Sequence, residues 1–244
     1  MKAVLRWIVL LGLSLLALQL YFVLRIALMA VVDPQSTTFE RTQIWRIAKT
    51  QHELPWRQDW RDHDQLASSL KRAVIASEDS AFVQHHGIWW DALEQAWQKN
   101  AKAQARADQQ AQRRPNAAPR PVKIVGGSTI TQQLAKNLFL SGERTLVRKG
   151  QEMMITLTLE ALLSKRRILE IYLNHVEWGE GVFGAEAAAQ HYFRKPAGRL
   201  DNWEAARLAV MLPRPRYFEK LAQSSYLNER AFTITARMAE VRIP

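Results

Sequence analysis

Two neighbouring carboxylates stand where an apolar stretch of the chain gives way to a turn. Glu78 and Asp79 end the run AVIASED, and Phe82 follows shortly after. A carboxylate pair that leaves a helix in this way can serve in general acid–base catalysis. Burial against Ile75 and Phe82, together with the like charge of Asp79, would raise the pKa of a carboxyl toward neutrality. A solvated helix end is the alternative interpretation of the same residues.

A third carboxylate, Glu152, follows two cations in the run RKGQE. Arg148 lies four residues before it and Lys149 three residues before it, so in a helix both cations share its face. The apolar run that follows, residues 153–163, is typical of a helix that passes through a core. We therefore expect an ionised carboxylate near the start of a central helix, stabilised by two cations and by the helix dipole. A purely structural ion pair is the alternative.

A glycine-led segment, GGSTITQQLAKN at residues 126–137, is richer in polar side chains than a packing helix needs. After the Gly-Gly turn it predicts a helix that Ser128 or Thr129 can cap. Its hydroxyl, amide and ammonium groups suit the oxygens of a phosphate or a sugar at a helix N-terminus. The candidate donors are Ser128, Thr129, Gln132, Gln133 and Lys136.

The sequence disfavours several other chemistries. The chain has no cysteine, which removes disulfides, thiol nucleophiles and thiolate metal sites. It contains no Walker-type phosphate loop, and its six histidines have no metal-binding spacing such as HExxH. Ser68 and Lys71 match the S-x-x-K pattern of penicillin-binding enzymes, but no K-T-G follows, so we interpret the match as chance.

The composition and the N-terminus indicate a membrane-anchored protein with an anionic partner. The 244 residues are 48% hydrophobic, and 34 Lys and Arg against 23 Asp and Glu give a net charge of +11. Residues 7–24 contain no charge, and at about 1.5 Å per residue they roughly span a hydrocarbon core of about 30 Å. Lys2 and Arg6 precede this run, so the positive-inside rule places the N-terminus in the cytoplasm. We expect an uncleaved single-pass anchor over residues 1–32, with Arg25 reaching the interface, rather than a cleaved signal peptide.

The segment after the anchor, residues 33–65, is expected to lie close to the membrane. Trp45, Trp56 and Trp60 alternate with arginines and a lysine, a mixture suited to the headgroup layer. A solvated linker whose tryptophans pack on the folded domain is equally compatible with this pattern. A basic domain tethered outside the cytoplasm meets phospholipid headgroups and lipid-linked phosphates, so we expect no nucleic acid partner.

From residue 66 onward the hydrophobic pattern is helical, without long alternating strands or a βαβ rhythm. We predict an all-α domain over residues 66–244. Residues 98–123 carry seven Lys and Arg against one Asp, and Pro115, Pro119 and Pro121 stop any helix there. We interpret this segment as a mobile basic loop inside the domain, although a helical pattern drifts into it from residue 88. The predicted helices cover residues 66–79, 88–112, 128–140, 148–164, 165–177 and 202–212.

In combination, these segments resemble the peptidoglycan glycosyltransferases of family 51, most of all the monofunctional biosynthetic ones. The first family motif, E-D-x-x-F-x-x-H-x-G, reads here as Glu78 to Gly87. The second matches Gly126 to Asn137, and the third, R-K-x-x-E, matches Arg148 to Glu152. The fourth motif falls on Lys165 to Asn174, and a fifth region ends in residues 187–195. Five motifs in order, over most of the exported part, make the resemblance very specific.

The resemblance implies a fold and a reaction. The family has a partly lysozyme-like helical domain and polymerises lipid II, a disaccharide-pentapeptide on undecaprenyl pyrophosphate, into glycan strands. Glu78 matches the general base that deprotonates the 4-hydroxyl of the acceptor GlcNAc. That oxygen attacks C1 of the donor MurNAc with inversion and expels the lipid pyrophosphate. Glu152 matches the second catalytic glutamate, which helps to orient or stabilise the leaving group.

The same resemblance implies binding residues, cofactors and partners. Lys136, Arg148 and Lys149 match the cations around the pyrophosphate. We expect no obligatory cofactor, although a divalent cation, Mg²⁺ or Mn²⁺, is compatible with this site. The expected partners are lipid II, the growing glycan strand, membrane lipids and other cell-wall synthesis proteins, at the periplasmic face of a bacterial inner membrane. The other substrate-binding matches are Asp79, Phe82, His85, Ser128, Thr129, Gln132, Gln133 and Asn137.

Two features depart from the family pattern, and two other functions stay open. The basic segment of residues 98–123 is longer than the family usually carries between its first two motifs. The chain also ends at Pro244, without room for a transpeptidase domain. We therefore expect the enzyme to synthesise strands without cross-linking them. A glycan-cleaving enzyme with Glu78 as general acid is one alternative, which the anchor and the cations disfavour. A non-catalytic scaffold is the other, which the two intact glutamates disfavour.

Overall fold

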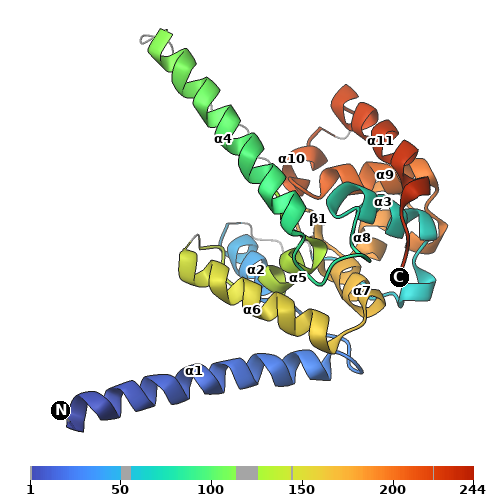
Figure 1. The fold of residues 1–244 in the computed structure, drawn as a ribbon. Coiled ribbons are helices and arrows are strands. Elements are labelled where there is room, and N and C mark those ends of the chain that lie inside the picture. Colours follow the sequence, from blue (N-terminus) through green and yellow to red (C-terminus); the bar gives the residue numbers. More distant parts are fainter. Residues whose placement is uncertain (1, 51–55, 114–125, 144, 222) are drawn as a thin grey trace.

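The computed structural model describes residues 2–50, 56–113, 126–143, 145–221 and 223–244. The described chain is mainly helical, with one small two-stranded antiparallel sheet, so the all-α prediction is confirmed (Figure 1). Its α-helices are α1 (Lys2–Leu28), α2 (Thr38–Thr50), α3 (Ser68–Glu78), α4 (Trp90–Arg113), α5 (Ile130–Phe139), α6 (Leu146–Leu162), α7 (Lys165–His175), α8 (Ala185–Phe193), α9 (Asn202–Met211), α10 (Pro215–Glu219) and α11 (Ser225–Arg237). The strands are β1 (Glu177–Gly179) and β2 (Val182–Phe183), and short 3₁₀ turns lie at His63–Gln65, Ala197–Arg199 and Met238–Glu240.

Helix α7 lies at the centre of the fold. Every residue from Ile168 to His175 is buried. The apolar ones belong to the core, and the polar ones form hydrogen bonds, as between His175 and Glu40. Ser164 begins the helix as its N-cap, accepting a hydrogen bond from the backbone N–H of Arg167. On one side of the core, α3 packs against α9 and α11, and on the other α5 packs against α6 and α7. The helices that carry the candidate site residues are therefore held on a common core.

Helix α1 is the one helix among the described residues that is long and apolar enough to cross a membrane. A single face of it touches the domain, through Gln19, Phe22, Ile26 and Met29, whereas its other side chains are exposed. Phe22 meets Phe139 edge to face at 5.2 Å between ring centroids. Gln19 donates a hydrogen bond from Nε2 to Oε1 of Gln151 on α6 at 2.9 Å. The exposed remainder fits the predicted membrane anchor.

One arginine fixes the end of α1 to the central helix. Arg167 on α7 donates from Nε to the backbone oxygen of Met29 at 2.8 Å and from Nη2 to the carboxylate of Asp33 at 2.6 Å. Its Nη1 also contacts Glu170, at 2.6 Å, on its own helix. Because the planar guanidinium satisfies all three partners at once, the chain leaves α1 in a defined direction.

Some tryptophans of the membrane-proximal segment pack on the domain, and another is exposed, as an interfacial residue would be. Trp56 stacks on Phe183 at 4.6 Å between ring centroids, and Trp60 meets the ring of His175 at 5.8 Å. These two therefore pack on the domain. Trp45 on α2 stays 65% exposed, with the ammonium of Lys49 over its ring. Residues 51–55 of this segment lie outside the described residues.

The basic segment after the first motif differs from its interpretation as a loop. Helix α4 continues to Arg113 and projects from the body of the molecule (Figure 1), so residues 98–113 are helical. Alanine, glutamine, lysine and arginine, which fill this stretch, all favour helix, and no proline occurs before residue 115. The rest of the predicted loop, residues 114–123, lies outside the described residues.

Helix α6 also differs from expectation, because it lies at the edge of the fold and not at its centre. Its buried residues, among them Ile155 and Leu159, form one face only. On the other side Leu146 and Val147 are 91% and 84% exposed, and Met154 is half exposed. The apolar pattern suggested a buried helix, but the described residues leave these side chains exposed, and α6 also contacts the candidate membrane helix α1 through Gln19 and Gln151.

Candidate active site

Glu78 is the last residue of α3 and lies partly buried at the base of the site. Its Oε2 accepts a hydrogen bond from Nε2 of Gln133 on α5 at 2.9 Å. Burial raises the pKa of the Glu78 carboxyl, against the effect of hydrogen bonds from Gln133 and Ser77, and the nearby charge of Asp79 adds to the increase. The direction agrees with the expectation from sequence. A carboxylate in this setting takes up a proton more readily than an ordinary glutamate.

A buried tyrosine orients the glutamine that contacts Glu78. The hydroxyl of Tyr172 on α7 donates to Oε1 of Gln133 at 3.0 Å, which turns the Gln133 amide nitrogen toward Glu78. Tyr172 is fully buried, and this burial raises the pKa of its phenol well above the usual value, so it stays a neutral donor. Tyr172 lies in the fourth motif, but nothing in the sequence pairs it with a residue 39 positions away.

Asp79 is buried beneath the site and joins the first motif to the second. One oxygen of its carboxylate accepts from the backbone N–H of Ile130 at 3.1 Å, and the other accepts from Nε2 of His85 at 2.8 Å. The Nδ1 of His85 accepts from the N–H of Gly87 at 3.1 Å, so Nε2 carries the proton. Asp79, His85 and the fully buried Phe82 were expected to bind substrate. The structure buries Asp79 and Phe82 and bonds His85 to Asp79, so contact of these three residues with a substrate stays a prediction.

The second motif is locked to the first by a capping box. Thr129 caps α5 by accepting from the N–H of Gln132 at 3.1 Å, and the Gln132 side chain accepts from the N–H of Thr129 at 3.0 Å. The Thr129 hydroxyl donates to the backbone oxygen of Gly87 at 2.6 Å. Thr129 and Gln132 are therefore buried in structural bonds, whereas Ser128 is exposed and Asn137 partly exposed. Of these four, Ser128 and Asn137 stay available to a ligand.

Glu152 lies in the second turn of α6 and is held by the two predicted cations. Arg148 Nη1 donates to Oε2 at 2.9 Å, and Lys149 Nζ donates to Oε1. Glu152 is 3% exposed. Lys136 on α5 lies close by: desolvation lowers the pKa of its ammonium, an effect that Arg148 and Lys149 reinforce and the charge of Glu152 opposes. The Nε of Arg148 is buried without a hydrogen-bond partner among the described residues, as in a site that awaits a ligand oxygen.

Glu78 faces two cavities. One, of about 320 Å³, lies between α3 and the first turns of α4 and includes Ser128 and the Gly126–Gly127 turn in its wall. The other, of about 990 Å³, opens under α10 and α11. Ser77, Glu78 and Gly126 belong to both. A ligand bound beside the Glu78 carboxylate can therefore extend into either cavity.

The two carboxylates Glu78 and Glu152 lie in different surroundings, which suit them to different roles. Glu78, with a raised pKa and one amide partner, can accept and hold a proton. Glu152 is occupied by two cations, and with Lys136 it forms a cluster of three cations and one anion that suits a larger anion. The described residues contain no group of three or more His, Asp or Glu that could hold a metal ion. Three cations around one carboxylate suit an anion better than a resident metal.

Comparison with known proteins matches most of the chain to one family. The family model described as Transglycosylase matches residues 46–239. A "Biosynthetic peptidoglycan transglycosylase" of Burkholderia thailandensis is 52% identical over 229 residues, which cover 94% of this chain and 83% of that protein. A protein of the same name from Burkholderia ambifaria is 48% identical over 243 residues, which cover 98% of this chain and 92% of that protein. The similarity to this second relative extends over almost the entire chain.

Proposed function

This chain belongs to the transglycosylase family, and we propose that it polymerises lipid II into glycan strands with Glu78 as general base and release of undecaprenyl pyrophosphate. It is a peptidoglycan transglycosylase, a glycosyltransferase of cell-wall synthesis. The observation that carries the proposed mechanism is the contrast between Glu78, whose pKa is raised, and the cation cluster around Glu152.

In the proposed reaction Glu78 takes the proton from the 4-hydroxyl of the acceptor GlcNAc. The freed oxygen attacks C1 of the donor MurNAc, and the bond from C1 to the pyrophosphate oxygen breaks, which inverts the configuration at C1. The proton ends on the Glu78 carboxylate, which its partly buried position favours. The bond from Gln133 supports this role because it fixes the direction of the carboxylate before the acceptor arrives.

The leaving pyrophosphate is proposed to bind the cations of α5 and α6. Lys136, Arg148 and Lys149 supply positive charge where negative charge develops on the departing oxygen. The buried Nε of Arg148, which has no hydrogen-bond partner among the described residues, supplies a donor for one of its oxygens. Glu152 holds Arg148 and Lys149 in place through both of its oxygens, so its proposed role is to position these cations against the leaving group.

The lipid part of the substrate is proposed to reach this cluster from the membrane. Helix α1 packs against α6, so the helix that carries Glu152 lies beside the proposed anchor. Leu146 and Val147 at the start of α6 are among the most exposed apolar side chains of the described residues, as expected of groups that face lipid. We infer that α1 crosses a bacterial inner membrane with its N-terminus in the cytoplasm, and that the domain of residues 66–244 lies on the periplasmic side. The growing strand, membrane lipids and other cell-wall synthesis proteins are the proposed further partners.

The test is to incubate detergent-purified protein with labelled lipid II and to separate the products on a gel. We expect a ladder of glycan strands, which Glu78→Gln reduces about 10²- to 10⁴-fold. Glu229→Gln, which removes an exposed glutamate of α11, is the matched control and should leave the ladder intact. Intact lipid II together with shortening of preformed glycan would instead identify a hydrolase. A folded protein that changes neither substrate would identify a scaffold.

A further inference from the structure

Four cations around Glu78 take no part in the mechanism above. Lys99 and Arg237 line the smaller cavity beside Glu78, and Arg214 and Arg230 line the larger one. All four side chains are exposed, and none of them forms an ion pair with a carboxylate of the described residues. Like charges gathered without partners repel one another, so the arrangement suits an anionic ligand.

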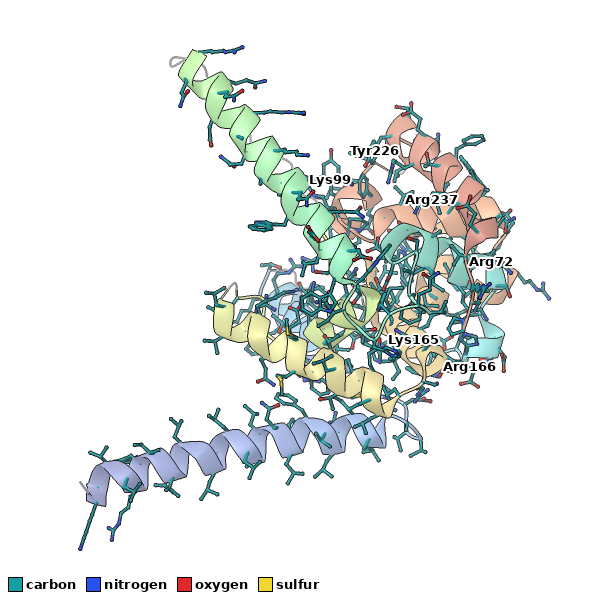
Figure 2. The ribbon with its side chains drawn as sticks, in the orientation of Figure 1. Arg72, Lys99, Lys165, Arg166, Tyr226 and Arg237 are labelled. Atoms are coloured by element: carbon teal, nitrogen blue, oxygen red, sulfur yellow. The ribbon has the colours of Figure 1, made fainter. Side chains whose placement is uncertain are left out.

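These cations come from separate elements that face one another. Figure 2 shows Lys99 on the side of α4 that faces α10 and α11, with Tyr226 and Arg237 across from it. The two cavities meet at Ser77, Glu78 and Gly126. We call the combined space the cationic cleft, with walls formed by Lys99, Arg214, Tyr217, Tyr226, Arg230 and Arg237.

Two half-exposed tyrosines stand among the cations. Tyr217 is 50% exposed and Tyr226 is 46% exposed. Tyr226 stacks on buried Phe218, with 5.8 Å between the ring centroids and 7° between their planes, so its outer face is held toward the cavity. The guanidinium of Arg214 lies 4.8 Å from the ring of Tyr217. Rigid aromatic faces beside cations suit a ligand that has both apolar faces and negative charges.

The position of the cleft argues against the pyrophosphate as this ligand. Helices α10 and α11 lie on the side of the body opposite α1 (Figure 1). The pyrophosphate is attached to a lipid tail and must stay near the membrane, where α6 and its cations adjoin α1. The part of the substrate that extends away from the lipid is the disaccharide with its peptide. A peptide with a free C-terminus ends in a carboxylate.

We propose that the cationic cleft binds the peptide carboxylates of the substrate whose sugar lies beside Glu78. The inference rests on the proposed lipid II polymerisation and names a second recognition element for it. The larger cavity, about 990 Å³, lies at the upper end of the roughly 300–1,000 Å³ typical of ligand pockets, which leaves room for sugar and peptide together. Exposed arginines bind carboxylates through two parallel hydrogen bonds, so the cleft selects for charge and planarity.

The experiment compares lipid II with lipid II whose peptide carboxylates have been converted to neutral amides. Both forms have the same size, the same sugars and the same pyrophosphate. For wild-type protein we expect amidation to raise KM about 3- to 20-fold, with little change in kcat, because exposed ion pairs are individually weak and several are lost together. The double variant Arg214→Gln and Arg230→Gln should lose this discrimination, so that its KM values for the two substrates agree within about twofold.

Matched controls separate this proposal from a general effect of charge. Arg199→Gln combined with Arg242→Gln removes two exposed arginines outside the cleft and should keep the wild-type discrimination. Lys99→Gln tests the opposite wall if the double variant fails to fold, and it should lower the discrimination by itself.

Equal KM values of wild type for the two substrates overturn the proposal. So does a double variant that retains full discrimination, because the cations would then contact the sugar or the pyrophosphate. Polymerisation of both substrates by wild type supports the proposed function whatever the cleft does. Failure to polymerise either substrate overturns the proposed function itself.

Discussion

Replacing Tyr172 with phenylalanine removes one hydroxyl from a chain of hydrogen bonds that ends on Glu78. The Tyr172 hydroxyl lies 3.0 Å from Gln133 Oε1, and Gln133 Nε2 lies 2.9 Å from Glu78 Oε2. Without the hydroxyl, the Gln133 amide loses the partner that decides which end faces Glu78. We expect slower polymerisation. We also expect a further rise in the pKa of Glu78, because its hydrogen bond with Gln133 opposes the effect of burial.

The size of the effect follows from the kind of bond that is lost. A neutral hydrogen bond contributes about 0.5–1.5 kcal/mol net, so Tyr172→Phe should lower kcat about 2- to 13-fold at about 1.36 kcal/mol per factor of ten. Gln133→Leu removes the bond to the carboxylate itself. Such a charge-assisted bond contributes about 1.5–3 kcal/mol, which predicts a loss of about 13- to 160-fold.

The assay is steady-state polymerisation of lipid II over a range of pH. In Tyr172→Phe the acid limb of the profile should move to higher pH, a change that a purely structural role would not cause. Tyr192→Phe is the matched control, because Tyr192 also donates its hydroxyl to a buried acceptor, the backbone oxygen of Trp178 at 2.8 Å, away from both glutamates. The reasoning is refuted if Tyr172→Phe keeps the wild-type profile, or if Tyr192→Phe shifts it equally.

Four other outcomes can be measured. In wild type, kcat/KM should fall as the pH drops through a value above the ordinary glutamate range, because burial raises the pKa of Glu78. A profile whose acid limb lies at the pKa of a free glutamate would contradict the prediction. Because its pKa is raised, the ionised Glu78 carboxylate destabilises the fold at neutral pH, so Glu78→Gln should keep or increase Tm at that pH. This gain in Tm should vanish as the pH falls toward the pKa of the same carboxyl in the unfolded chain. A lower Tm of the variant at neutral pH would show that the carboxylate stabilises the fold. Inhibition by inorganic pyrophosphate should weaken as the pH rises through a value below the ordinary lysine pKa, because desolvation lowers the pKa of Lys136. The same inhibition should be weaker in Lys136→Ala. Equal inhibition of both proteins would place the phosphate site elsewhere. Gly87→Ala should lower the free energy of unfolding by about 1–3 kcal/mol in a thermal melt. Gly87 has φ +84°, and an added methyl group would lie 2.7 Å from Thr156 Cγ2. In the control Gly142→Ala the added methyl meets no atom within 4 Å, so this variant should have little effect.

Local spacing predicted the parts of the site that lie within one helix. The helical period placed Arg148 and Lys149 on the face of Glu152, and both contacts occur. Ser128 and Thr129 were the two candidate caps of this helix, and Thr129 is the N-cap of α5. In each case the interacting residues are three or four positions apart, so the backbone geometry alone brings them together.

Contacts between distant segments could not be predicted in this way. Asp79 binds the N–H of Ile130, 51 positions away, and Tyr172 binds Gln133 across 39 positions. These bonds exist because α7 fills the centre of the fold and α5 lies against it, an arrangement that no local pattern encodes. The same limit explains why the burial of Asp79, which was expected to bind substrate, could not be predicted.

The apolar pattern of α6 gave a wrong prediction of its surroundings. The side chains of α6 suggested a helix surrounded by protein, yet Leu146, Val147 and Met154 are exposed. A sequence pattern reports that a face avoids water, and it does not say whether protein or membrane covers that face.

The join between α1 and the domain determines how far the enzyme can reach. A domain on a loose tether could tilt and swing and would meet glycan at many distances from the bilayer. Here Gln19 and Phe22 hold α1 against α6 and α5, and Arg167 binds both Met29 and Asp33 where α1 ends. If α1 crosses the membrane as proposed, these contacts tie the body to it, and Glu78 would then keep a nearly constant height above the lipid. New strands would then be laid down in a single thin layer, and thickening of the wall would have to come from older material moving outward.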